Sequence, residues 1–154
     1  MDYLKEYRRW ADSPLLDEEE RASLAAIADK EEEIKSRFYA PLAFGTAGLR
    51  GVMDAGLARM NRHVIRQASQ GMAELIKSAG GQKRGVVICY DCRLNSEAFA
   101  RTAAEVFCGN GIMVSLFDAL RPTPELSFAI RELGAIAGVN VTASHNPREY
   151  NGYK

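Results

Sequence analysis

The sequence predicts an α/β fold, a three-layer α/β/α sandwich around a mainly parallel, mixed sheet, with a helical extension before it. From residue 61 onward, short apolar runs alternate with amphipathic segments of helix length. Strands separated by such helices favour parallel pairing with right-handed crossovers. Residues 1–40 are instead highly charged, with apolar residues at helical spacing. We therefore expect a helical extension over 1–40 and an α/β domain over 41–154.

The overall composition excludes several classes of partner. The 154 residues are 47% hydrophobic and 26% charged, as in an ordinary globular protein. Lysine and arginine number 20 and aspartate and glutamate also number 20, so no net field attracts nucleic acid or an anionic membrane. No apolar run approaches the roughly 20 residues of a membrane span, and the charged start does not resemble a signal peptide. We expect a cytoplasmic protein.

The cysteines are predicted to be free thiols. Cys89, Cys92 and Cys108 are odd in number and lack the spacing of a disulfide framework, which favours a reducing compartment. Cys89 and Cys92 form a C-x-x-C pattern, which redox and zinc proteins also use. No second pair completes a zinc site, and Cys89 lies in an apolar run. We interpret the pattern as a core thiol and a loop thiol.

The helical extension is predicted from spacing and from helix-start patterns. Apolar residues at helical spacing between residues 4 and 11 indicate a short amphipathic helix. Asp17 with Glu20 three residues later resembles a capping box, which marks a second helix start. Asp29 with Glu32 repeats the pattern and predicts a third.

A glycine-rich segment, Phe-Gly-Thr-Ala-Gly-Leu-Arg-Gly, follows at residues 44–51. It lacks the Gly-Lys-Ser/Thr of a P-loop and does not match G-x-G-x-x-G. Its spacing alone indicates only a flexible turn with an exposed arginine. The guanidinium of Arg50, however, suits bidentate phosphate binding.

The α/β domain is predicted to begin with a long helix over residues 61–78, which carries one apolar stripe. A later helix is expected to be capped by Asn95 or Ser96, and another by Thr123. Three buried strands are expected between and after these helices: 85–90, 112–117 and 135–142.

Polar side chains follow all three predicted strands. The carboxyl ends of parallel strands meet at one edge of the sheet, where open α/β sheets place their reactive groups. We therefore expect a site at this edge from residues that follow the strands in turn: Asp91 and Arg93, Arg121 and Thr123, Ser144 and His145.

Ser144 is the candidate nucleophile at this edge. A serine hydrolase needs a base within reach of the hydroxyl, but His145 is adjacent in sequence and His63 lies at a helix start. The G-x-S-x-G pattern is absent too. Phosphoryl transfer fits better, because it depends on positioning and on cations. Arg50, His145 and Lys154 could stabilise a phosphorylated Ser144, and Lys154 could also move protons.

Residues 142–154 read Thr-Ala-Ser-His-Asn-Pro, then, from Tyr150, Tyr-Asn-Gly-Tyr-Lys. This closely resembles the phosphoserine signature of the α-D-phosphohexomutases, the phosphoglucomutases and phosphomannomutases. Residues 44–51 resemble the arginine loop of the family's first domain, and residues 90–96 a further family segment. The arginine loop is most similar to the branch of phosphopentomutase-like and glucose 1,6-bisphosphate-handling phosphoglucomutases.

The resemblance implies a role for each matching residue. Ser144 would be the phosphoserine and, through its phosphate, a ligand of Mg²⁺. Arg50 and His145 would contact the phosphoryl group or the substrate, and Lys154 would bind phosphate and transfer protons. Asn146 would hold the loop and would also bind the substrate or its phosphate. Family members interconvert sugar 1-phosphates and 6-phosphates through a bisphosphate, with glucose 1,6-bisphosphate as activator.

The resemblance covers only the first of the four domains of these enzymes. The acidic metal loop, the sugar-recognition loop and the terminal phosphate-binding loop have no counterpart here. The chain would be an N-terminal catalytic-serine domain, inactive alone, with a phosphosugar substrate and the remaining domains of the same enzyme as partners. The alternative is a non-catalytic anion-binding or interaction module that reuses the fold.

Overall fold

The computed structural model describes residues 2–46 and 48–154, so Ala47 of the glycine-rich segment lies outside the described residues. The elements follow one another in the order α1 (Tyr3–Ala11), α2 (Glu18–Ala25), α3 (Glu31–Phe38), β1 (Leu49–Val52), α4 (Arg62–Ser78), β2 (Val86–Tyr90), α5 (Ser96–Gly109), β3 (Val114–Leu116), α6 (Thr123–Glu132), β4 (Ala137–Val141) and β5 (Tyr150–Tyr153). Within these ranges no helix is both long and apolar enough to cross a membrane.

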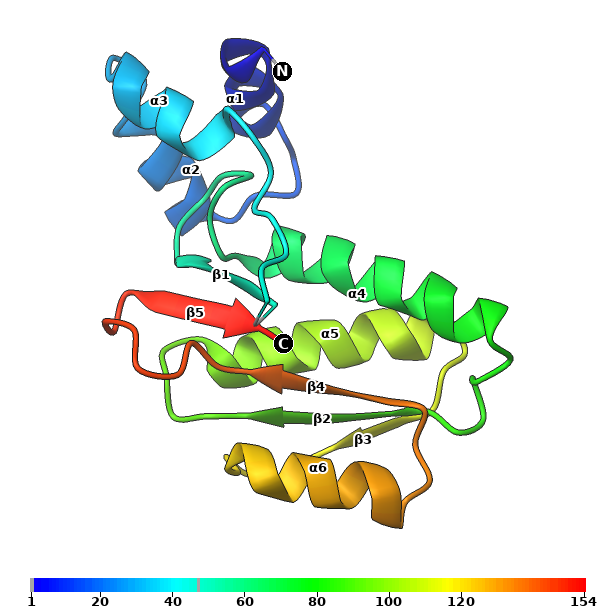
Figure 1. Ribbon diagram of the computed structural model, residues 1–154. Helices are drawn as coiled ribbons and strands as arrows, with labels where there is room; N and C mark the ends of the chain where they lie inside the picture. The colour runs from blue at the N-terminus through cyan, green and yellow to red at the C-terminus, as the bar shows by residue number, and fades with distance from the viewer. Residues whose placement is uncertain (1, 47) are drawn as a thin grey trace.

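The described strands form one mixed sheet in the order β1-β5-β4-β2-β3. Strand β2 runs parallel to β3 and to β4, whereas β5 runs antiparallel to β4 and to β1. Helices α4 and α5 cover one face of the sheet and α6 covers the other, which gives three layers (Figure 1). The predicted α/β/α sandwich with a mixed sheet is confirmed.

Strand β2 is buried throughout because helices cover both of its faces. Val86 and Ile88 belong to the larger core beneath α4 and α5. Val87 and Cys89 point the other way, into a smaller core with Leu126 of α6. The alternation follows from the period of two residues in a strand.

The first three helices have a small core of their own. Tyr7 and Trp10 of α1 meet the ring of Phe38 in α3 edge to face, with centroids 5.7 and 5.8 Å apart. His63 of α4 packs against Trp10 in the same way at 5.3 Å, so its ring belongs to this core. Leu24 of α2 completes this core.

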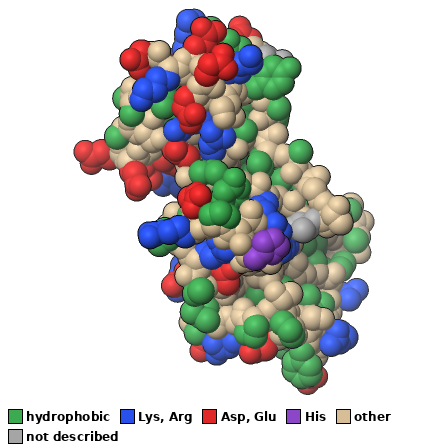
Figure 2. All heavy atoms as spheres, turned by 60° about the vertical axis from the view of Figure 1, so that its left-hand side comes forward, with side chains coloured by type: hydrophobic (Ala, Val, Ile, Leu, Met, Phe, Trp, Pro, Cys, Tyr) green, Lys and Arg blue, Asp and Glu red, His purple; other side chains and the backbone are tan. Residues whose placement is uncertain are grey.

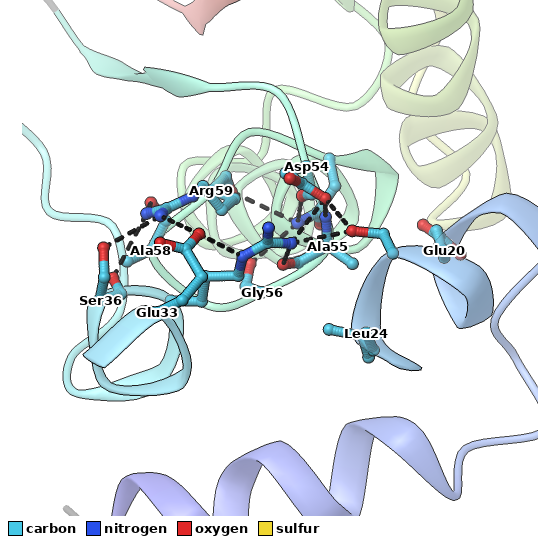
Figure 3. Close-up of polar contacts among 12 residues, drawn as sticks. Glu20, Leu24, Glu33, Ser36, Asp54, Ala55, Gly56, Ala58 and Arg59 are labelled. Atoms are coloured by element: carbon cyan, nitrogen blue, oxygen red, sulfur yellow. Dashed lines mark hydrogen bonds and ion pairs between the residues drawn. The ribbon is translucent and has the colours of Figure 1, made fainter. Parts of the chain in front are cut away.

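A polar network attaches these helices to the segment that follows β1 (Figure 3). The guanidinium of Arg37 in α3 lies 2.7 Å from a carboxylate oxygen of Asp54 and 2.8 Å from one of Glu33. Arg37 also donates to the hydroxyl of Ser23 in α2. Arg59 adds contacts to Glu33 and to Ser36. The segment between β1 and α4 is therefore held from the side of the helical extension.

Some local predictions were wrong. The capping box at Asp17 and Glu20 is present, but α3 begins after Lys30, which makes no side-chain cap, so Asp29 does not cap it. Helix α6 has Pro122 at its N-cap position. The hydroxyl of Thr123 instead accepts a hydrogen bond from the Asn140 amide at 2.7 Å, which joins α6 to β4.

The strands also differ from the predicted ranges. Strands β1 and β5 were missed, and the strand predicted over 112–117 spans only Val114–Leu116. Both missed strands are four residues long, too short for a clear alternation to be visible in the sequence. The pairing of β1 with β5 joins residues about 100 positions apart, and β5 in turn pairs with β4.

Candidate active site

Ser144 lies in the exposed turn that joins β4 to β5. Its φ of 57° places it in the left-handed region, which is uncommon for a residue with a side chain. The Ser144 amide donates to the hydroxyl of Thr142 at 3.0 Å, and the Asn146 amide donates to the carbonyl of Ala143 at 3.2 Å. The turn therefore presents the hydroxyl of Ser144 beyond the carboxyl end of β4, as predicted.

His145 is close to the Ser144 hydroxyl but is not set up as its base. Its Nδ1 lies 3.4 Å from Oγ of Ser144, a long hydrogen bond. Within the described ranges no carboxylate contacts the ring of His145 to orient it. The geometry therefore does not support a hydrolase triad.

Arg50 reaches this turn from β1, which lies two strands away from β4. Its Nη1 donates to Oδ1 of Asn146 at 2.7 Å, a contact between residues 96 positions apart. Strand β5 makes the contact possible, because Arg50 pairs with Gly152 in the ladder. The structure thus brings Ser144, His145, Asn146 and Arg50 together.

Lys154 lies farther along the chain, just after β5. Its backbone exchanges hydrogen bonds of 3.0 and 2.9 Å with the backbone of Asn140 in β4. Its side chain is exposed, and among the described residues no hydrogen bond joins it to Ser144. Among the described residues, Lys154 is therefore tied to β4 through its backbone, and its role in the site stays a prediction.

Arg93 was predicted to lie at this edge, but the sequence indicated no individual role for it. It follows β2, and its side chain is only 13% exposed. Its guanidinium donates to four backbone carbonyls of the turn: Ser144 and Asn146 at 2.6 Å, Pro147 at 2.9 Å and Tyr150 at 3.2 Å. Its position after a buried strand, at the same edge as Ser144, was the signal that could have shown this role.

A second layer of polar groups holds Arg93 in place. The Asp91 carboxylate lies 3.6 Å from Nε of Arg93 and accepts hydrogen bonds from the Arg93 amide and the Ser96 hydroxyl. The Ser96 hydroxyl in turn accepts from the buried amide of Asn151 in β5. The ends of β2, α5 and β5 are therefore tied together beneath the turn.

The surface around the turn carries charges of both signs. On the face drawn in Figure 2, acidic and basic side chains are mixed over the amino-terminal helices, and basic side chains lie beside a histidine lower down. Among the described residues, no group of three or more histidine, cysteine, aspartate or glutamate side chains is placed to hold a metal ion.

Residues 41–154 match the family described as phosphoglucomutase/phosphomannomutase, alpha/beta/alpha domain I. The chain belongs to this family. The predicted resemblance to the phosphohexomutases is confirmed, on the range that includes the Arg50 strand and the Ser144 turn.

Named relatives of this phosphohexomutase domain include mutases of several sugars. A phosphopentomutase of Mus musculus is 39% identical over 97% of this chain, and a phosphoglucomutase of Staphylococcus saprophyticus is 43% identical over 80%. The crystal structure of a "putative phosphomannomutase" from Thermus thermophilus superposes with a TM-score of 0.68 at 39% identity, over 75% of this chain and 25% of that one. The chain spans about a quarter of the length of these relatives.

The two cysteines of the C-x-x-C pattern in this phosphohexomutase domain are not joined by a disulfide. All three cysteines are free, with Cys89 buried and Cys92 exposed. The thiol of Cys89 contacts the Asn140 side chain at 3.2 Å. Burial raises the pKa of the Cys89 thiol to about 11, which leaves it protonated and unreactive near neutral pH.

A large cleft also lies away from the Ser144 turn. It has a volume of about 690 Å³ and opens between α2, the segment after β1, α4 and α5, with Glu20, Asn61 and Phe99 among its lining residues. Ser144 is not part of its wall. In this phosphohexomutase domain the Ser144 turn therefore lies outside this cleft.

Proposed function

We propose that this chain is the phosphoserine-bearing first domain of a phosphoglucomutase or phosphomannomutase, which interconverts sugar 1-phosphates and 6-phosphates through a bisphosphate. One observation carries the proposal: an exposed Ser144 hydroxyl projects from a turn that Arg50 and Arg93 hold from two other strand ends. The names of the relatives support the class of reaction, an intramolecular phosphotransfer.

In this proposal Ser144 carries the phosphoryl group. Its Oγ forms a bond to phosphorus as the bond from phosphorus to the sugar oxygen breaks, and the proton of the hydroxyl ends on that sugar oxygen. A guanidinium has five N–H donors, and among residues 2–46 and 48–154 the hydrogen bond to Asn146 uses one donor of Arg50. The remaining donors, with His145, are available to a phosphate dianion.

Two further roles complete the proposed site. Lys154 transfers protons and binds phosphate once substrate is present, because an ammonium on a four-carbon stem can swing from the end of β5 toward the turn. Asn146 holds the turn against Arg50 through the contact of 2.7 Å. The sugar-binding groups belong to other domains.

We propose that residues 1–40 form a helical extension and residues 41–154 domain I of a four-domain enzyme. Partners are then the remaining domains and a phosphosugar, with glucose 1,6-bisphosphate as activator.

Mg²⁺ is expected in the whole enzyme, but the described residues of this chain do not fit a complete metal site. Ser144 would give only one ligand, through its phosphate. Free thiols and phosphosugar substrates support a cytoplasmic setting.

The phosphoryl carrier can be tested by intact mass. Glucose 1,6-bisphosphate treatment of the full-length enzyme should add one phosphoryl group, and the Ser144→Ala variant should add none. Ser13→Ala, which changes a half-buried serine of the helical extension, is the matched control and should still be phosphorylated. A phosphoryl group that persists in Ser144→Ala would show that another residue is the carrier.

The division of the site between domains gives a second test. The purified 154-residue chain should turn over glucose 1-phosphate at least about 10⁴-fold more slowly than the full-length enzyme, because positioning of the sugar is lost. Robust turnover by the chain alone would contradict the proposal. A full-length protein whose Ser144 is never phosphorylated would instead favour a non-catalytic anion-binding module.

A further inference from the structure

The turn that carries Ser144 has an unusual internal partner in Arg93. Four carbonyl oxygens from a stretch of seven residues converge on one guanidinium, at 2.6 to 3.2 Å. Two of these contacts, to the carbonyls of Ser144 and Asn146, fall on either side of His145. The guanidinium is largely buried beneath the turn, whereas Ser144 itself is exposed.

The direction of these carbonyls matters for a phosphorylated serine. A phosphoserine carries a charge of about −1.5 to −2 at neutral pH, and carbonyl oxygens are the negative ends of peptide dipoles. Each carbonyl that Arg93 holds points toward its guanidinium, which belongs to a largely covered side chain. The Ser144 and Asn146 carbonyls are therefore kept from the exposed side, where the phosphoryl group would stand.

Arg93 is itself fixed by its neighbours. Asp91 balances its charge at 3.6 Å and accepts its backbone amide at 2.9 Å. Asp91 also accepts the Ser96 hydroxyl at 2.7 Å, and Ser96 accepts the Asn151 amide at 2.9 Å. Arg93 thus lies between β2 and α5, but its guanidinium binds the loop between β4 and β5. A rigid support of this kind is what accurate placement of a reacting group requires.

We propose that Arg93 is a positioning residue for phosphoryl transfer, which sets the turn so that the Ser144 hydroxyl faces the reacting group and the turn's carbonyls do not. The inference rests on the proposed function of Ser144. Among the described residues, the contacts of Arg93 with Ser144 and Asn146 are to backbone carbonyls, not to the hydroxyl or to the side chains proposed to bind phosphate. It therefore acts on the chemical step through the backbone.

The planar guanidinium is essential to this role. Its donors diverge in one plane and reach several carbonyls at once, whereas a lysine ammonium is a compact point charge on a flexible stem. Arg93→Lys should keep the charge next to Asp91 but lose part of the carbonyl set. Arg93→Ala should lose all of it. The two variants separate the charge from the geometry.

Arg84 provides a matched control at the opposite end of the sheet. It too donates to backbone carbonyls, those of Gly134 at 3.0 Å and Ala135 at 3.2 Å, just before β4. Arg84→Ala should disturb a loop to a similar degree without altering the Ser144 turn. Any general effect of removing a carbonyl-binding arginine would appear in both Arg84→Ala and Arg93→Ala.

The first measurement is steady-state kinetics in the full-length enzyme. We expect kcat to fall roughly 100-fold in Arg93→Ala and about tenfold in Arg93→Lys, the scale of a displacement of about 1 Å at a reacting group. KM for glucose 1-phosphate should stay within about twofold in both, because Arg93 does not touch substrate. Unchanged kcat in Arg93→Ala, or a loss confined to KM, would overturn the proposal.

The second measurement is hydrogen exchange in the 154-residue chain, which needs no activity. Amides of residues 143–150 should exchange at least about tenfold faster in Arg93→Ala and Arg93→Lys than in the unaltered chain and Arg84→Ala. Equal exchange would show that Arg93 does not hold the turn, and the inference would fail by itself. Absence of phosphorylation on Ser144 of the unaltered enzyme would instead refute the proposed function. If Arg93→Ala fails to fold, Arg93→Lys decides both measurements.

Discussion

At the scale of single residues, the Ser144 turn combines backbone strain with several local restraints. A non-glycine residue in a sparsely populated backbone region costs on the order of 1–3 kcal/mol. Ser144 has a φ of 57°, and its amide and carbonyl are both engaged, by Thr142 and by Arg93. Hydrogen bonds that involve a charged donor contribute roughly 1.5–3 kcal/mol each. Those from Arg93 are therefore large enough to offset the strain.

The thiols offer a prediction at the same scale. At pH 8 only about one Cys89 thiol in a thousand is ionised when its pKa is about 11, and the side chain is fully buried. A disulfide reagent such as dithiobisnitrobenzoate should therefore label Cys92 and Cys108 quickly and Cys89 at least about 100-fold more slowly. Stopped-flow absorbance and intact mass give the rates and the number of adducts.

Cys89→Ala is the control for this prediction. It should leave the number of fast adducts at two, whereas Cys92→Ala should reduce it to one. Three adducts formed at one rate in the native chain would contradict the buried, protonated state of Cys89.

At the scale of elements, β5 decides the shape of the site, because it lies between β1 and β4. The sequence predicted the parallel strands from continuous apolar runs, and it placed Ser144 correctly at a strand end. It could not predict β1 and β5, since residues such as Arg50, Asn151 and Gly152 do not favour strands. Their pairing comes from contacts across about 100 residues, which local propensity does not encode.

Gly152 is the residue that lets β1 and β4 approach β5 from both sides. A Cβ at this position would lie 2.6 Å from the Thr142 carbonyl oxygen and 2.8 Å from that of Leu49. Both neighbours are backbone atoms, so neither can move aside easily. Gly152→Ala should destabilise the fold by about 3 kcal/mol, at the upper end of overpacking effects. Urea unfolding followed by circular dichroism measures this change.

Gly71→Ala is the matched control, because its added Cβ on α4 would meet nothing within 4 Å. It should raise the free energy of unfolding by about 0.5–1 kcal/mol, as alanine favours a helix. A neutral Gly152→Ala would show that β1 and β4 approach β5 less closely than described.

The network around Arg37 gives a second prediction for an element contact. Asp54 accepts from this 9% exposed guanidinium and from the Ala55 amide, so Asp54→Ala leaves an under-compensated charge. We expect a loss of about 2 kcal/mol of stability, the scale of a hydrogen bond to a charged group. Glu97→Ala, which removes an exposed pair with Arg101, should cost less than about 0.5 kcal/mol. Equal losses of stability in Asp54→Ala and Glu97→Ala, measured by thermal unfolding, would contradict this prediction.

The same network sets a pH dependence. The hydrogen bond from Arg37 lowers the pKa of Glu33 below its ordinary value of 4.5. Glu33 therefore adds stability above pH 4.5, and this is lost as the pH falls through its lower folded-state pKa. Its carboxylate is 40% exposed, so the effect should stay below about 1 kcal/mol. Glu33→Gln should flatten the stability curve between about pH 5 and pH 3. If the free energy of unfolding from urea titrations changes with pH equally in Glu33→Gln and in the unaltered chain, Glu33 is not the source of the pH dependence.

At the scale of the whole molecule, the chain holds separate cores. The two cores on either face of the sheet draw no described residue from 1–40. The core of the helical extension, however, includes Ala55 and packs against Leu57, which belong to the segment after β1. The core of the helical extension therefore requires residues of the α/β domain. The two cores of the α/β domain are complete without the helical extension.

Two truncations test this asymmetry. Residues 41–154 alone should fold cooperatively and keep the Ser144 turn, because both sheet cores are complete. Residues 1–40 alone should show little helix, since short isolated helices are marginal and a chain of this size cannot bury enough apolar surface. Far-ultraviolet circular dichroism and amide NMR spectra distinguish the two outcomes.

In the longer fragment, the amides of residues 53–61 should exchange faster than in the whole chain, because Asp54 has lost its contact with Arg37. A stable helical fragment 1–40, or an unfolded fragment 41–154, would mean that the two parts form one cooperative unit.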